Sequence, residues 1–123
     1  MKIILNHSSM VPIYEQLINQ IKAAIARGEL KAGSALPSVR NLAAELKISA
    51  LTVKKAYDRL EEEGLLVTVH GKGSFVSERN LGFIAESRRH EAEMILSEAL
   101  ERVKSTGLNN DEIRQLIDII LED

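Results

Sequence analysis

The chain has 123 residues, of which 45% are hydrophobic and 3% aromatic, with no cysteine and a formal net charge of −2. This length supplies one modest domain and argues against a multidomain enzyme, and the lack of cysteine excludes disulfides and thiolate metal sites. Aliphatic side chains must fill the core, which favours a mostly helical fold. No segment has the length of a signal peptide or a membrane span, so we expect a cytoplasmic protein with no membrane partner.

Charge is distributed unevenly along the chain. Residues 1–78 carry ten Lys and Arg against eight Asp and Glu, whereas residues 79–123 carry six against ten. A basic first part is where a polyanion would bind. The polar stretch 77–80 is the expected hinge, so we predict two regions, 1–78 and 79–123.

The first periodic segment spans about residues 12–27, with apolar residues at helical spacing. Pro12 stands where the first turn of a helix tolerates proline, and Gly28 is a natural stop. The following loop is predicted to contain a short extended piece near residues 34–36.

Two helices and a hairpin are expected next. Ser38 and Ser49 are capping residues for a two-turn helix and for a longer one that ends before Gly64. A short turn between such helices makes a helix-turn-helix. The β-branched run 65–69 and residues 74–76, separated by turn residues, predict a β-hairpin, and the whole is a winged helix-turn-helix.

The C-terminal part is predicted to form two helices. One runs from Leu81 to about Lys104, and Gly107 interrupts the pattern. Asn109 and Glu112 have capping-box spacing at the start of the other. The expected fold is therefore mainly α with a small β-hairpin: an N-terminal winged helix-turn-helix and a two-helix C-terminal dimerisation tail.

A winged helix-turn-helix places its second helix in the major groove of DNA and its hairpin on the neighbouring backbone. Taken singly, the serines are explained as caps and the hairpin tip as a solvated turn. Together, hydroxyl groups, cations and a glycine from successive elements fall on one side, which predicts a DNA-binding surface. Its candidate residues are Ser38, Arg40, Ser49, Thr52, Lys54, Lys55, His70, Gly71 and Lys72.

Four motifs occur in order: Leu-Pro-Ser-Val-Arg-Asn-Leu-Ala at 36–43, Thr-Val before Ala-Tyr at 52–57, Leu-Glu-Glu-Glu-Gly-Leu at 60–65 and Gly-Lys-Gly-Ser-Phe-Val at 71–76. This arrangement resembles the GntR family of bacterial transcription regulators. The opening Pro-Ile-Tyr-Glu-Gln-Leu at 12–17 and the short helical tail resemble its YtrA-like subfamily. The resemblance implies DNA contacts by Arg40, Ser49, Thr52, Lys54 and residues 70–72.

The sequence departs from the family at two positions of the presumed recognition helix. Many members carry Arg, Asn or Pro at the position of Ala50 and a polar residue at that of Leu51. Leu51 could contact a thymine methyl group, or the operator preference could differ from the family's usual one. The operator sequence and the target genes stay open.

The tail is too short for the effector domain of larger relatives, so no cofactor is expected and any effector is unknown. Its broad aliphatic face predicts a homodimer; the alternative is a tail that folds back on the head. Dimerisation also matches a palindromic operator. The candidate dimer residues are Ile84, Ile95, Leu96, Leu100, Val103, Ile113, Leu116, Ile117 and Ile120.

The sequence gives little support for a catalytic site or a metal site. A phosphate-binding loop ending at Gly71 and Lys72 would need a glycine where Leu66 stands and a Ser or Thr where Gly73 stands. His7, His70 and His90 lie on separate predicted elements, and Glu86 with His90 is more simply a surface pair than two metal ligands. The acidic run 61–63 points in several directions on a helix. We therefore expect no enzyme and no metal site but a DNA-binding regulator, most simply a repressor; the alternative is a winged-helix module that binds proteins.

Overall fold

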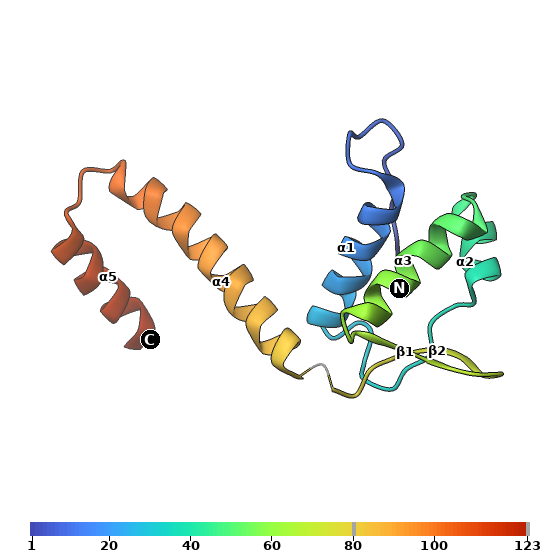
Figure 1. Cartoon of the computed structure of the whole chain (residues 1–123). Helices are drawn as coiled ribbons and strands as arrows, with labels where there is room; N and C mark the ends of the chain where they lie inside the picture. Colours follow the sequence, from blue (N-terminus) through green and yellow to red (C-terminus); the bar gives the residue numbers. More distant parts are fainter. Residues whose placement is uncertain (80, 123) are drawn as a thin grey trace. The chain divides into compact units, whose positions relative to one another are not determined.

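The computed structural model describes residues 1–79 and 81–122. Its elements, in chain order, are α1 (Ile13–Ala26), α2 (Val39–Leu46), α3 (Ala50–Glu62), β1 (Leu66–Val69), β2 (Gly73–Val76), α4 (Leu81–Lys104) and α5 (Asn110–Glu122) (Figure 1). The mainly helical fold with one hairpin is as predicted. The backbone forms two compact units, Met1–Ser87 and Arg88–Asp123. The first turns of α4 therefore belong to the first unit. The expected hinge at 77–80 includes Asn80, which lies outside the described residues.

The predicted helix starts are confirmed by their caps. The Ser38 hydroxyl accepts a hydrogen bond from the Asn41 amide, and the Ser49 hydroxyl accepts one from the Thr52 amide, each at 3.1 Å. Each bond satisfies an amide that the first helical turn would leave without a partner. Pro12 precedes α1 as its N-cap, one position outside the helix.

The core of the first unit joins three helices and the hairpin. The apolar faces of α1, α2 and α3 meet around Leu17, Ile21 and Leu60, which are fully buried. Leu66 and Val76, paired across the hairpin, are buried in the same core. The hairpin lies below α1 and α3 in the view of Figure 1. The hairpin is thereby fixed against the end of α3.

The extended piece predicted near residues 34–36 is confirmed and adds an edge to the hairpin. Ala35 bridges Phe75, the Leu36 amide donates to the Ser74 carbonyl, and the Val76 amide donates to the Ser34 carbonyl, both at 2.9 Å. The segment that leads into α2 is thus hydrogen-bonded to β2, so the wing and the start of α2 form one connected piece.

The turn between α2 and α3 contains a conformation that the sequence did not indicate. Lys47, which ends α2, has φ +57° and ψ +45°, in the left-handed region that glycine usually occupies. Its geometry lets the Ile48 amide donate to the Ala43 carbonyl at 3.0 Å. This bond closes α2 and turns the chain toward α3.

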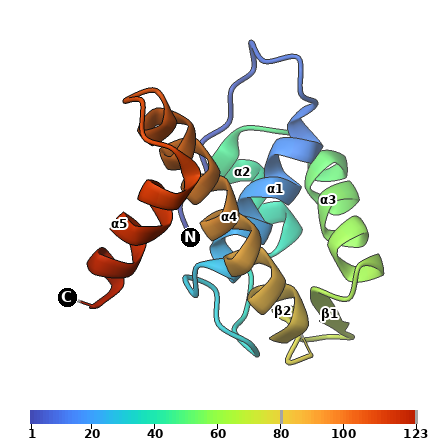
Figure 2. The same cartoon turned by 90° about the vertical axis from the view of Figure 1, so that its left-hand side faces the viewer.

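The segment before α1 projects as a loop beyond the start of that helix in both views (Figures 1 and 2). Two glutamines of α1 hold the base of this loop. The Gln16 side chain donates to the Asn6 and Val11 carbonyls and accepts from the Asn6 amide, and Gln20 pairs in the same way with both backbone groups of Ile4. No feature of the sequence analysis predicted this attachment.

The second unit contains the remainder of α4 and all of α5. Asn109 and Glu112 exchange hydrogen bonds at 3.1 and 2.9 Å, which confirms the predicted capping box, and Gly107 takes φ +95° in the turn between the helices. Ile113 is its buried hydrophobic residue among those described, whereas Ile95, Leu96, Leu116 and Ile120 are exposed. None of the helices that the structure describes combines the length and the hydropathy needed to span a membrane.

Candidate nucleic-acid interface

An open hollow of about 580 Å³ lies between α2, α3 and the hairpin. Arg40 from α2, Lys54 from α3, and Thr68 and Ser74 from the two strands line it. Three elements separated in the sequence therefore meet at one surface, as the sequence predicts for Arg40 and Lys54. Among the residues that the structure describes, no carboxylate forms an ion pair with Arg40, so its guanidinium is available to donate hydrogen bonds to an external partner.

Lys54 is paired within α3. Its Nζ atom lies 2.8 Å from Oδ2 of Asp58, one helical turn further on, and both side chains are more than half exposed. The hydrogen bond to Asp58, together with the charge of that carboxylate, raises the pKa of Lys54 above its usual value. Lys54 therefore stays protonated at neutral pH and carries a neighbouring negative charge that a phosphate would have to compete with.

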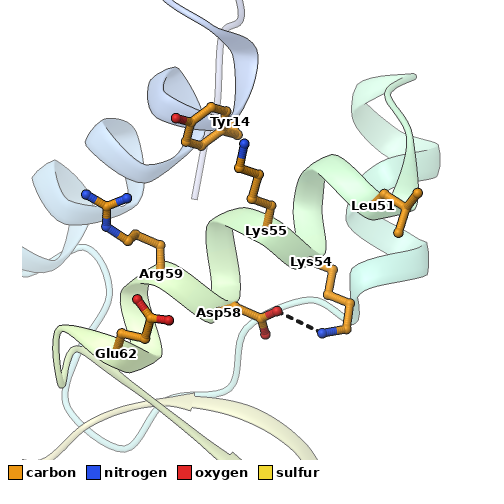
Figure 3. A pocket seen from close by; sticks show the side chains of 7 residues that line it. All are labelled: Tyr14, Leu51, Lys54, Lys55, Asp58, Arg59 and Glu62. Carbon is orange, nitrogen blue, oxygen red and sulfur yellow. Dashed lines mark hydrogen bonds and ion pairs between the residues drawn. The ribbon is translucent and has the colours of Figure 1, made fainter.

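Lys55 points to the opposite side of α3 from Lys54 (Figure 3). Its ammonium group lies 3.8 Å from the centroid of the Tyr14 ring on α1, a cation–π contact. The two lysines therefore have different partners, although both line a second hollow beside α3, together with Tyr14, Leu51, Asp58, Arg59 and Glu62 (Figure 3).

The hydroxyl groups near the start of α3 serve as caps. Ser49 and Thr52 share a side-chain hydrogen bond of 2.7 Å, and the Ser49 oxygen also accepts from the Thr52 amide. Ser38 similarly caps α2 and lies at the surface. These bonds fix the positions of the predicted contact residues and engage part of their hydrogen-bonding capacity.

The turn of the hairpin contains the other candidates, His70, Gly71 and Lys72, all of which are exposed. The Lys72 amide donates to the Val69 carbonyl at 2.9 Å, and Gly71 has φ +79°, a value that side chains disfavour. Lys72 also lines a hollow on the outer side of the strands with Val67 and Val69. The tip is therefore an ordered turn that presents one cation to solvent.

Tyr57, which the sequence offered only as the end of the motif at 52–57, also contributes to the site. Its buried side chain crosses from α3 to the segment before α2, where the hydroxyl donates to the Pro37 carbonyl at 2.7 Å. Burial raises the pKa of Tyr57 to about 12. The bond links α3 to the start of α2 and so helps to position Arg40.

The remaining candidates are distributed as follows. Ile84 packs, partly buried, against the core of the first unit, while Leu100, Val103 and Ile117 are half-buried. His7, His70 and His90 lie in three separate segments of the chain. Within residues 1–79 and 81–122, no three histidine or carboxylate side chains gather in a way that could hold a metal ion.

Two short helices joined by a tight turn, with a hairpin packed against the second, define a winged helix-turn-helix protein. The family described as "Bacterial regulatory proteins, gntR family" matches residues 13–76. The chain belongs to this family of bacterial transcription regulators.

The relatives agree with the YtrA-like resemblance. The chain is 42% identical to the HTH-type transcriptional repressor YtrA of Bacillus subtilis over 80 residues, which are 65% of this chain and 62% of YtrA, so it matches less than two thirds of that protein. Among solved structures, a transcriptional regulator from Oenococcus oeni has a TM-score of 0.70 at 31% identity and covers 95% of this chain and 97% of its own. The DNA-binding domain of AraR, in complex with operator ORX1, has a TM-score of 0.56 at 28% identity over 63% of this chain and 96% of its own.

Proposed function

We propose that this protein represses transcription by binding a palindromic operator as a homodimer, with residues 1–78 as the DNA-binding head and residues 79–123 as the dimerisation tail. The observation that carries the proposal is the hollow in which Arg40, Lys54 and the hairpin strands meet. A cation from each of two helices beside a wing fits a major groove bounded by phosphates. The repressor YtrA and the operator-bound AraR domain support this assignment.

The apolar residues of the tail support the dimer. Ile95, Leu96, Leu116 and Ile120 expose between 41% and 62% of their surface. Two helices of this kind bury too little of their own apolar surface to be stable alone, and a second copy supplies matching surface. Ile84 packs on the head, so the proposed interface rests on the later residues of α4 and on α5.

Dimerisation also suits the geometry of DNA. Two recognition helices about 34 Å apart reach successive turns of the major groove and match a twofold-symmetric site. Linking two weak heads raises the affinity for such a site well above that of one head. We place this activity in the cytoplasm, where bacterial DNA lies, and it requires no cofactor.

The test is binding of the purified protein to duplexes selected from a random library, measured by fluorescence anisotropy over a range of salt concentrations. With about eight phosphate contacts per dimer, the logarithm of the association constant should fall with log salt at a slope of about −7. Lys54→Gln should weaken binding and make this slope less steep by about one per half-site.

The control is Lys104→Gln, which removes the same charge from the predicted tail and should leave the slope unchanged. If no duplex is selected and binding to random DNA is insensitive to salt, the chain is not an operator-binding protein. A winged-helix module that binds proteins would then be the better assignment.

A further inference from the structure

Leu51 is an exposed leucine on the outer face of α3. It exposes 79% of its surface and points away from the helix into solvent (Figure 3). Val53, Ala56 and Leu60 of the same helix are buried in the core, so the packing of the head does not require Leu51 to be apolar. An aliphatic side chain left in water at such a position is available to a binding partner.

The neighbours of Leu51 indicate what kind of partner fits. Leu51 lines both hollows beside α3: the one with Arg40 and Lys54 toward the hairpin, and the one with Lys55 toward α1. Cations thus lie on both sides of an apolar centre. Carboxylates lie among them, since Asp58 lines both hollows, Glu61 the first and Glu62 the second. A helix in the major groove meets this pattern, because phosphates bound the groove on both sides and base edges form its floor.

Hydrogen-bonding groups at this end of α3 are largely engaged. Ser49 and Thr52 bond to each other and cap the helix, and Ala50 has no polar atom. The outermost side chains of the first turn, Ala50 and Leu51, are therefore apolar and exposed. On the edges of base pairs in the major groove, the apolar group is the 5-methyl of thymine.

We propose that Leu51 selects thymine in each operator half-site by packing on its 5-methyl group. This inference rests on the proposed function, because it requires that α3 enter the major groove. It assigns a base preference to the exposed apolar side chain in the first turn of α3. Arg40 and Lys54 would supply hydrogen bonds and positive charge. Leu51 would discriminate between thymine and an unmethylated pyrimidine.

The experiment compares selected duplexes in which thymine is replaced by deoxyuridine, one position at a time. Deoxyuridine pairs like thymine and lacks only the methyl group. At one position per half-site the wild-type affinity should fall about fourfold, the effect of one buried methyl, and about fifteenfold when both half-sites are changed. Leu51→Ala should bind the thymine and deoxyuridine duplexes equally, and Leu51→Met should keep the discrimination.

Met10→Ala is the control, because Met10 is a 99% exposed apolar residue that lies off α3, and this variant should discriminate as the wild type does. Melting temperatures of all variants verify that each is folded. Wild-type binding that is indifferent to deoxyuridine at every position overturns the inference while leaving operator binding intact. Discrimination that survives in Leu51→Ala overturns it as well, whereas absence of DNA binding by the wild type refutes the proposed function itself.

Discussion

Asp58 and Lys54 form an ion pair at the proposed interface, and this pair places a carboxylate where phosphates would lie. Asp58→Asn removes that charge and releases Lys54. We expect DNA affinity to rise by up to about fivefold per half-site, and so by up to about 25-fold for the dimer, since an exposed ion pair is worth about 1 kcal/mol at most, with little change in stability. Anisotropy titrations with the same duplex measure the effect.

Asp118→Asn in α5 is the matched control, because it changes the net charge equally without touching α3. It should leave the affinity near that of the wild type. A loss of affinity in Asp58→Asn would show instead that Asp58 holds Lys54 in the orientation that binds DNA.

Tyr57 makes the stability of the head depend on pH in alkaline solution. Its hydroxyl has an ordinary pKa of 10.0, as in the unfolded chain, and a pKa of about 12 in the folded protein. Between these values the unfolded state has lost a proton that the folded state retains, so the free energy of unfolding falls as pH rises, by up to about 1.4 kcal/mol per pH unit. Below pH 10 this contribution to the pH dependence is absent.

Tyr57→Phe should remove this dependence. The variant loses the bond to the Pro37 carbonyl and should be about 1 kcal/mol less stable at pH 7, but its stability should fall less than that of the wild type between pH 10 and 12. Urea unfolding at several pH values tests both effects. Parallel pH profiles for the two proteins would mean that Tyr57 ionises equally in the folded and unfolded states.

At the scale of single elements, Ser49 caps α3 and is also a proposed DNA contact, and two substitutions can separate these roles. Ser49→Ala removes the bond to the Thr52 amide and should cost about 1 kcal/mol of stability. Ser49→Asp retains a capping oxygen and should preserve stability, yet its carboxylate would repel phosphate and lower DNA affinity about tenfold. Thermal melting measures the stability of each variant, and fluorescence anisotropy measures its DNA affinity. If Ser49→Asp binds DNA as tightly as the wild type, Ser49 lies outside the interface.

The elements with local signals were predictable from the sequence. Ser38, Ser49 and the Asn109–Glu112 box fix helix starts through atoms three residues apart, and the β-branched run after Gly64 with the turn residues that follow it indicates the hairpin. The side chains that pair with Lys54 and Lys55 were not predicted. The four-residue spacing of Lys54 and Asp58 was a usable signal, whereas the contact of Lys55 with Tyr14 joins two helices that only the folded core brings together.

At the scale of the whole molecule, dimerisation should depend on the apolar stripe of α5. Ile120 is 62% exposed, so Ile120→Asp leaves the fold of the head intact and places a charge in the proposed interface. We expect a monomer of half the wild-type mass by light scattering, with weak binding to a palindromic duplex. Gln115→Asp, on the polar side of the same helix, is the control and should remain dimeric; a dimeric Ile120→Asp would show that the tail pairs through other residues.

The two glutamines that hold the N-terminal segment against α1 have a consequence for amide exchange. The Ile4 and Asn6 amides lie outside every helix and strand, yet each donates to a glutamine side chain. In deuterium oxide these two amides should exchange more slowly than others in the exposed loop, and Gln16→Ala should speed the exchange of Asn6 while leaving that of Ile4 slow. The N-terminal segment would then behave as a part of the folded head whose opening can be followed amide by amide.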